Sequence, residues 1–285
     1  MRVIILAAGE GKRLGPLTKD KPKCMISLFG KSLLQHQLDI FESCNIKDIS
    51  IVTGYKNDMI KIPNVTYFHN SDYQNTNMLE TLFCAKRKIN DEVIVVYGDI
   101  IFEKKNLELL LEEDEYISTV VDSNWKKYWD IRFEDPLDDA ESLEINEQGY
   151  IQSIGQKVDH YEKIQGQYIG LTKFQKKGCD IIKKFYKTTK NLAKKGKNPL
   201  NENIPFEKSY MTDFLQGMIN YNYEIKAVPI KNGWLELDSM HDYHIYNNKF
   251  KDGTISDFFQ LMISSFNRMI FHLLLIQVGI SDLSL

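Results

Sequence analysis

The stretch IILAAGEGKRLGPLTKDKPK, Ile4–Lys23, stands almost at the start of the chain and decides how the rest is interpreted. It places three glycines, two prolines, four lysines and one arginine directly behind a short apolar run, residues 2–7, that we predict to be a buried strand. Glycines after a strand allow backbone N–H groups to turn toward one point, which suits a bound polyphosphate. We therefore expect a phosphate-binding loop at the end of the first strand.

Two familiar phosphate-binding motifs do not fit this loop. The dinucleotide fingerprint requires G-x-G-x-x-G, whereas Gly9, Gly11 and Gly15 are spaced G-x-G-x-x-x-G, and the second predicted strand ends in Thr53 rather than in an acid. A P-loop requires a glycine five residues before its G-K-S, but Met25 stands there. We expect G-K-S, residues 30–32, to form a turn and a helix cap.

The loop does match the pattern G-x-G-x-R-x-x-P-L-T-x-x-x-P-K, the signature of nucleotidyltransferases that join a nucleoside triphosphate to a phosphorylated small molecule. Such a reaction depends on positioning and on neutralising phosphate charge. Lys12 and Arg13 are suited to the β- and γ-phosphates. Lys23, held by the preceding proline, is suited to the α-phosphate, where charge develops. The alternative is a solvated basic loop.

Two later segments carry carboxylates that could face this loop. VVYGD, residues 95–99, is an apolar strand that ends in Asp99, and Glu236 and Asp238 alternate along a second strand candidate, so they share one face. Three such carboxylates would make an oxygen-rich site for Mg²⁺, completed by phosphate oxygens and water. The alternatives are a helix cap at Asp99 and a polar edge strand at 234–238.

Strands predicted at 48–54, 64–70 and 92–99 alternate with helices predicted at 32–44 and 77–88. This alternation predicts a mostly parallel sheet with ligands beyond the carboxyl ends of its strands. In the second half we expect strands at 128–134 and 166–174, a hairpin at 142–155 and helices at 176–189 and 210–221. Neither a linker nor a repeat interrupts the chain, which favours one continuous domain.

The composition narrows the class of protein. A net charge of −3 over 285 residues argues against nucleic-acid binding, and the four cysteines show no C-x-x-C spacing, as expected of reduced thiols. The first apolar run is too short for a signal peptide, so we expect a cytoplasmic protein.

The opening signature, VVYGD and LELDSMHDY (235–243) together resemble the nucleotidyltransferase superfamily, and within it the small-molecule cytidylyltransferases that activate phosphocholine, 2-aminoethylphosphonate and similar phosphorylated amines. Four further stretches are similar to phosphoglutamine cytidylyltransferases of capsule phosphoramidate synthesis: NSDYQNTNMLETLFCA (70–85), RFEDPLDDAESL (132–143), IQGQYIGLTKF (164–174) and YMTDFLQ (210–216). The resemblance covers about residues 1–248.

The resemblance implies an α/β fold, a three-layer α/β/α sandwich with a mostly parallel central sheet of the nucleotide-diphospho-sugar transferase type. It implies CTP and a phosphorylated small molecule as partners, Mg²⁺ as cofactor, and catalytic roles for Arg13 and Lys23. The metal would be held by Asp99, Glu236 and Asp238. The nucleotide would be bound by Leu6, Ala7, Ala8, Gly9, Glu10, Gly11, Lys12, Arg13, Lys23, Asn77 and Gly98.

The acceptor side is less constrained. Trp125 and Trp129 stand four residues apart beside Arg132, so they offer aromatic faces for an ammonium group and a cation for a phosphate or carboxylate. Packing of both tryptophans in the core is the equal alternative. Gln167 and Tyr168 are further acceptor candidates, with a simple turn as their alternative.

The implied reaction is transfer of CMP to the acceptor, with L-glutamine phosphate giving CDP-L-glutamine, and release of pyrophosphate for surface polysaccharide modification. Alternatives are a phosphocholine or 2-aminoethylphosphonate acceptor, a sugar 1-phosphate enzyme using UTP or dTTP, and a non-catalytic nucleotide-binding regulator. A homo-oligomer is left open.

The domain expected from the resemblance is 1–249, followed by an apolar extension at 250–285 that we expect to be helical. Asn267, Arg268, His272 and Gln277 interrupt the apolar run, which argues against a membrane span.

Overall fold

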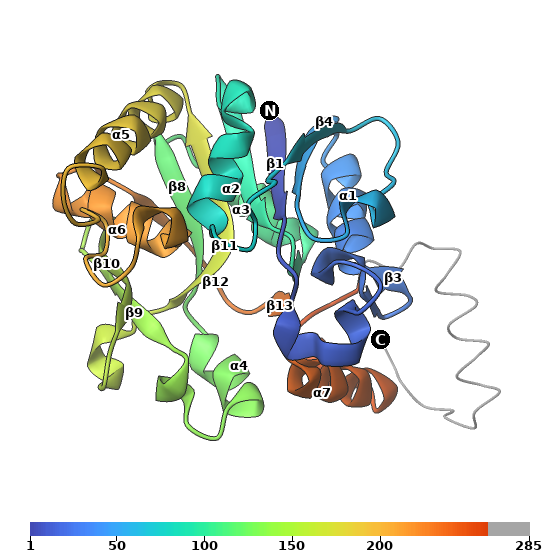
Figure 1. The fold of residues 1–285 in the computed structure, drawn as a ribbon. Coiled ribbons are helices and arrows are strands. Elements are labelled where there is room, and N and C mark those ends of the chain that lie inside the picture. The colour runs from blue at the N-terminus through green and yellow to red at the C-terminus, as the bar shows by residue number, and fades with distance from the viewer. Residues whose placement is uncertain (262–285) are drawn as a thin grey trace.

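The computed structural model describes residues 1–261, and a seven-stranded sheet forms its centre (Figure 1). The strand order is β12–β8–β11–β6–β1–β4–β5. Strand β11 is antiparallel to both of its neighbours, and every other pairing in this sheet is parallel. The strands are β1 Arg2–Ala7, β4 Asp48–Thr53, β5 Thr66–His69, β6 Glu92–Tyr97, β8 Ile117–Asp122, β11 Gln167–Gln175 and β12 Lys226–Ile230.

Helices cover both faces of the sheet because the side chains of its strands alternate between two cores. Val3 and Ile5 of β1 belong to a core that α1 and α3 complete, and Ile4 and Leu6 belong to a second core with α2, α5 and α6. The predicted three-layer α/β/α sandwich is therefore confirmed. The helices are α1 Leu33–Ser43, α2 Met78–Cys84, α3 Lys104–Glu112, α4 Trp125–Arg132, α5 Lys177–Ala193, α6 Met211–Asn220 and α7 Met240–Lys251.

Three small antiparallel pairs attach to this frame. They are β2 Ser27–Leu28 with β3 Lys31–Ser32, β7 Ile100–Phe102 with β13 Trp234–Glu236, and β9 Glu141–Ile145 with β10 Ile151–Lys157. The β7–β13 pair matters most for function, because it places Glu236 opposite Ile100 and so brings two distant acidic segments together. In Figure 1 the loop after β1, β13, α4 and α7 all gather at the lower end of the sheet, opposite the N-terminus.

The elements that the sequence predicted are found in the structure, with one clear exception, whereas α3, β8, β12 and α7 were not predicted. Residues 128–134, predicted as a strand, belong instead to helix α4 and its end. Its buried residues are Trp125, Tyr128, Trp129 and Arg132, a spacing of three and four that belongs to one face of a helix. The expected cap is confirmed, since the Ser32 side chain accepts a hydrogen bond from the Gln35 N–H at the start of α1.

The chain after α7 returns to the body of the protein. Phe258 and Phe259 are buried, and the backbone N–H of Gln260 donates to Glu103 at 2.8 Å. The division at residue 249 remains a prediction, and the rest of the predicted apolar extension lies outside the described residues. No helix within residues 1–261 has the length and apolarity that a membrane crossing needs.

Gly54, which follows β4, packs closely against the opening loop at Ala8. A Cβ at this position would lie 2.7 Å from the Ala8 carbonyl oxygen and 2.8 Å from the Tyr73 Cβ. We expect Gly54→Ala to lower the free energy of unfolding by about 1–3 kcal/mol because backbone must move to admit the methyl group. Urea unfolding measures the change, and Gly196→Ala is the control, since nothing lies within 4 Å of its Cβ. Equal stabilities of the two variants would contradict the described packing.

Candidate active site

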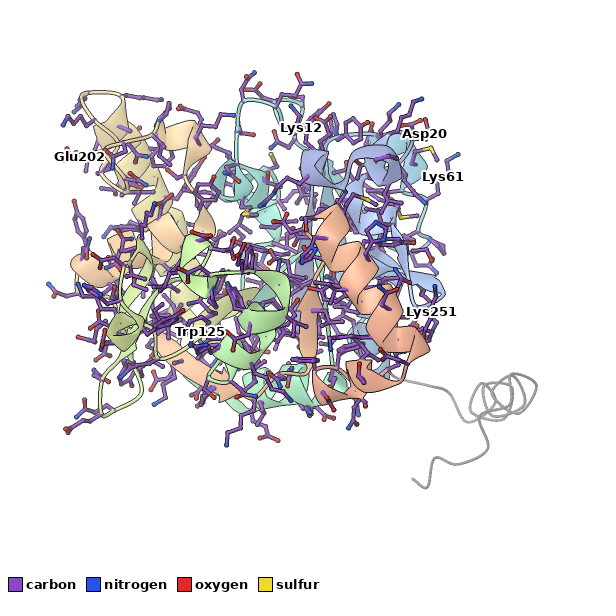
Figure 2. The ribbon with its side chains drawn as sticks, turned by 90° about the horizontal axis from the view of Figure 1, so that it is seen from below. Lys12, Asp20, Lys61, Trp125, Glu202 and Lys251 are labelled. Atoms are coloured by element: carbon purple, nitrogen blue, oxygen red, sulfur yellow. The ribbon has the colours of Figure 1, made fainter. Side chains whose placement is uncertain are left out.

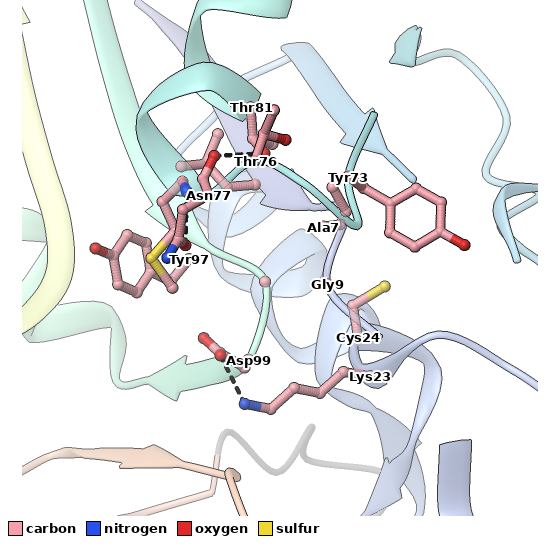
Figure 3. A pocket seen from close by; sticks show the side chains of 14 residues that line it. Ala7, Gly9, Lys23, Cys24, Tyr73, Thr76, Asn77, Thr81, Tyr97 and Asp99 are labelled. Carbon is pink, nitrogen blue, oxygen red and sulfur yellow. Dashed lines mark hydrogen bonds and ion pairs between the residues drawn. The ribbon is translucent and has the colours of Figure 1, made fainter. Parts of the chain in front are cut away.

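Lys23 lies at the centre of the candidate site. Its Nζ donates to Asp99 Oδ2 at 2.8 Å and to Asp238 Oδ1 at 2.8 Å, and its side chain is only 11% exposed. Figure 3 shows the contact with Asp99. The cationic loop and the acidic segments that the sequence singled out therefore meet in one place.

The opening loop is shaped to hold Lys23 in this position. Gly11 has a left-handed backbone with φ of 70°, and a Cβ there would lie 3.1–3.2 Å from three carbons of the Lys23 side chain. Glycine thus lets the loop lie directly over the lysine. Arg13 also joins the cluster through an ion pair between Nη2 and Asp238 Oδ2. Lys12 does not, because its side chain is 81% exposed and its ion pair is with Glu10, at 3.7 Å.

The turn that carries Asp99 is held in place by hydrogen bonds from Gln37 of α1. This buried amide donates to the carbonyl oxygens of Tyr97 and Ile100, each at 2.7 Å. The backbone carbonyl of Asp99 accepts from the Leu237 N–H at 3.0 Å. The turn of Asp99 is therefore linked both to α1 and to the segment that carries Asp238.

The charged groups of the cluster shift one another's pKa values. Burial opposes the charged form of Lys23, but the adjacent carboxylates of Asp99 and Asp238 outweigh it and raise the pKa of the lysine. Burial likewise opposes ionisation of Asp238, yet Lys23 and Arg13 lower its pKa. Burial raises the pKa of Glu236 to about 7, with Asp238 and Asp99 adding to the effect and Arg132 opposing it.

A pocket opens beside Lys23 and Asp99, at the carboxyl ends of β1 and β6 (Figure 3). Of the predicted nucleotide-binding residues, Glu10, Gly11, Lys12 and Arg13 belong to the neighbouring loop and do not line it. The sequence did not indicate Cys24, Tyr73, Thr81 or Tyr97, although Thr81 lies one helical turn after Asn77 and its spacing could have suggested it. The lining residues are Leu6, Ala7, Ala8, Gly9, Lys23, Cys24, Tyr73, Thr76, Asn77, Met78, Thr81, Tyr97, Gly98 and Asp99.

One wall of the pocket is built from the loop that leads into α2. Buried Asn70 donates to Thr76 Oγ1 at 2.9 Å and to Thr81 Oγ1 at 3.0 Å, which fixes the loop to the helix. Asn77 caps α2 by accepting from the Met78 N–H at 2.8 Å, and its own N–H donates to the Glu207 carbonyl at 2.9 Å. The wall thus presents polar groups on a rigid support, as recognition of a base would require.

The acidic cluster fits a divalent cation. The Oδ1 atom of Asp99 is buried without a hydrogen-bond partner, and carboxylate oxygens are the ligands that such ions prefer. Within residues 1–261, however, no three acidic, histidine or cysteine side chains are arranged to hold an ion by themselves. Oxygen atoms from a bound phosphate would therefore complete the site.

The predicted acceptor residues Trp125 and Trp129 are buried in the core, so packing, the alternative left open above, is what the structure shows. Trp125 Nε1 donates to the Ile164 carbonyl at 3.2 Å, and Trp129 Nε1 donates to Asp139 at 3.1 Å. Their rings also contact each other edge to face. Figure 2 places Trp125 on α4, among the side chains of its neighbours. Neither indole offers an open face to a ligand.

The other predicted acceptor residues differ in accessibility. The Arg132 side chain is 1% exposed and is paired with Asp242 and Glu236. Gln167 is buried and donates to the carbonyl oxygens of Glu141 and Gly166. Half-buried Tyr168 packs edge to face on Tyr97, which lines the pocket, so it is the one of these three that adjoins the pocket wall.

The fold and the site define a nucleotidyltransferase, an enzyme that transfers a nucleotidyl group. Residues 3–130 match the MobA-like NTP transferase domain. The chain is 38% identical over 260 residues to the CTP:phosphoglutamine cytidylyltransferase of Campylobacter jejuni, an alignment that covers 87% of this chain and 100% of that protein. The chain belongs to the nucleotidyltransferase family that includes this enzyme.

Solved structures support the fold. The CTP:phosphocholine cytidylyltransferase of Streptococcus pneumoniae superposes with a TM-score of 0.64 at 17% identity, over 87% of this chain and 98% of that one. The inositol-1-phosphate CTP transferase of T. maritima superposes with a TM-score of 0.66 at 22% identity, over 88% and 96%. Nucleotidyltransferases of this family generally use a divalent metal ion, in agreement with the donor set around Asp99.

The lowered pKa of Asp238 predicts a pH-dependent contribution to stability. Its charge stabilises the folded protein above the pKa of an unfolded aspartate, about 3.9, and this contribution is lost as the pH falls through the lower folded value. We expect Asp238→Asn to lower the free energy of unfolding by about 1–3 kcal/mol at pH 7, with a smaller difference below about pH 4.

Urea unfolding at several pH values measures this difference. The control is Asp180→Asn, which removes an exposed ion pair with Lys183 and should change stability by less than about 0.5 kcal/mol. A difference between Asp238→Asn and wild type that stays constant down to low pH would contradict the assignment.

Proposed function

We propose that this enzyme transfers CMP from CTP to a phosphorylated small molecule with release of pyrophosphate, and that the acceptor is L-glutamine phosphate, giving CDP-L-glutamine. The observation that carries the proposal is the Lys23 ammonium held between Asp99 and Asp238 beside a glycine-lined pocket. The name of the Campylobacter relative supports the choice of nucleotide and acceptor. We further propose a cytoplasmic reaction that serves modification of a surface polysaccharide.

In the proposed reaction an oxygen of the acceptor phosphate attacks the α-phosphorus of CTP in line. The new P–O bond forms as the bond from the α-phosphorus to the bridging oxygen breaks, and pyrophosphate leaves with that electron pair. Lys23 stabilises the charge that accumulates on the α-phosphate oxygens, and Arg13 neutralises the leaving pyrophosphate. The attacking phosphate is already ionised near neutral pH, so no general base is required.

In the proposed complex the pocket wall binds the base and ribose of CTP, and the pocket floor with the opening loop binds its phosphates. Asn77, Thr76 and Tyr73 line the wall suited to the base and ribose. Backbone N–H groups for the phosphates would come from Ala8 and Gly9 of the pocket and from the neighbouring loop at Gly11. Asp99, Asp238 and Glu236 would hold Mg²⁺, which when bound supplies Lewis-acid neutralisation of phosphate charge.

Four alternatives differ from this proposal in their chemistry. A phosphocholine acceptor would call for open aromatic faces against its quaternary ammonium group, and the buried rings of Trp125 and Trp129 weigh against that choice. A 2-aminoethylphosphonate acceptor makes no such demand. A sugar 1-phosphate enzyme would use UTP or dTTP, and a non-catalytic regulator would bind a nucleotide without turning it over.

Pyrophosphate release with each nucleoside triphosphate and a panel of acceptors separates these alternatives. We expect turnover with CTP and L-glutamine phosphate in the presence of Mg²⁺, and none with glucose 1-phosphate. Turnover with UTP and a sugar 1-phosphate but not with CTP would reject the proposal. Nucleotide binding without pyrophosphate release from any acceptor would favour the regulator.

The same assay tests the charged cluster. We expect Asp99→Ala and Asp238→Ala to abolish turnover while the proteins remain folded, because each removes a proposed ligand of the metal ion. We expect Lys23→Met to lower kcat by about 100–1000-fold, because it removes the cation proposed to stabilise the α-phosphate. Lys126→Gln, on the exposed surface of α4, is the control and should retain wild-type turnover. Near-normal turnover in either aspartate variant would remove that residue from the metal site.

A further inference from the structure

The segment 236–239, which carries two of the three clustered carboxylates, is held by side chains from two helices. The Glu236 N–H donates to the Tyr128 hydroxyl at 2.8 Å, and the Glu236 carbonyl accepts from the Tyr246 hydroxyl at 2.7 Å. The N–H groups of Asp238 and Ser239 both donate to Asp242 Oδ2, at 3.0 and 2.8 Å. With the bond from Leu237 to the Asp99 carbonyl, backbone groups at all four positions have fixed partners.

Arg132 ties this arrangement to the carboxylates themselves. Its Nε donates to Asp242 Oδ1 at 2.9 Å, and its Nη1 lies 3.1 Å from Glu236 Oε2. The guanidinium therefore bridges the carboxylate that holds the Asp238 backbone and the carboxylate of Glu236. The hydroxyls of Tyr128 and Tyr246 contact each other closely, which joins the two halves of the arrangement.

These groups are almost fully buried. The side chains of Arg132 and Asp242 are 1% and 3% exposed, and the guanidinium lies over the rings of Tyr128, Trp129 and Phe133. Desolvation makes such a pair a weak source of stability, and apolar residues of the same volume often serve as well. Its value at this place lies in geometry, because Arg132 contacts the Glu236 carboxylate directly and Asp242 holds the backbone of Asp238.

We infer that Arg132, Asp242, Tyr128 and Tyr246 form a positioning network that aims Glu236 and Asp238 at the cation. Arg132 thus acts through these carboxylates and does not contact the acceptor. The inference rests on the proposed function, since it assigns the network to the metal site of that reaction. Groups that orient metal ligands typically change metal affinity or activity by about 10–100-fold when removed.

Binding of Mn²⁺ to the protein with CTP and without acceptor tests the network apart from turnover. Electron paramagnetic resonance measures free Mn²⁺ for wild type, Asp242→Asn, Arg132→Lys and Tyr246→Phe. We expect Mn²⁺ binding to weaken by about 10–100-fold in Asp242→Asn. A smaller loss is expected in Arg132→Lys, which keeps the charge but not the planar fork, and in Tyr246→Phe, which removes one hydroxyl. Asp130→Asn, which breaks only an exposed pair with Lys126 on α4, is the matched control and should bind Mn²⁺ as wild type does.

Steady-state kinetics then separates positioning from acceptor binding. A positioning role lowers kcat and raises the metal concentration needed for half-maximal rate, and it leaves the KM for the acceptor unchanged. A raised acceptor KM in Arg132→Lys with unchanged Mn²⁺ binding would make Arg132 an acceptor ligand and overturn the inference. Wild-type Mn²⁺ binding in Asp242→Asn would overturn it as well.

Two further outcomes are informative. If Asp242→Asn fails to fold, as shown by circular dichroism, Tyr246→Phe decides the question, because it removes a single oxygen and keeps the ring. If wild type binds neither CTP nor Mn²⁺ with CTP, the proposed function fails and the inference fails with it, a result distinguishable from a loss confined to the variants.

Discussion

The ion pairs of Lys23 with Asp99 and Asp238 are the interaction on which the rest of this structure depends. They join residues separated by 76 and 215 positions in the sequence, so they can form only when the opening loop, the end of β6 and the segment after β13 are all in place. Each partner is largely removed from water. In such surroundings an unpaired charge would lower the free energy of unfolding. The fold therefore has to bring all three groups together. The parallel strands β1 and β6 place the loop of Lys23 and Asp99 at one edge of the sheet, and the antiparallel β7–β13 pair brings the segment of Asp238 to the same edge.

The surrounding elements fix the positions of the charged groups at this edge of the sheet. Gln37 of α1 fixes the turn that carries Asp99, and the β7–β13 pair brings Glu236 beside it. Helices α4 and α7 lie beneath the same edge and carry no residue that lines the pocket. Their buried polar residues face the acidic segment instead. This explains why Arg132 and Asp242 occupy positions where apolar side chains would avoid the free-energy cost of burying charge.

The sequence was sufficient for the elements and charges that depend on local pattern. Strand β1 and the Ser32 cap of α1 follow from periodicity and cap chemistry. That Lys23 would face Asp99 and Asp238 was indicated by the opening motif taken together with two separate acidic segments. The acceptor side could not be predicted in the same way. The sequence pattern of an aromatic residue next to cations occurs both in ligand sites and in packed cores. Only the tertiary structure shows that the Trp129 side chain is buried. The pocket wall at Tyr73 and Thr81 was equally hidden, because it depends on how the loop of Asn70 folds onto α2.

Charge balance links the cluster to the ligand. In the free protein Lys23 and Arg13 offset Asp99 and Asp238, and Arg132 offsets only one of Glu236 and Asp242. A triphosphate bound beside these carboxylates would add several negative charges, and the exposed side chain of Lys12 is paired with Glu10 and not with this cluster. A divalent ion, which nucleotidyltransferases of this family generally use, would offset this negative charge. Lys23 is held in this cluster from two sides, by Gly11, which lies directly over its side chain, and by its two carboxylate partners.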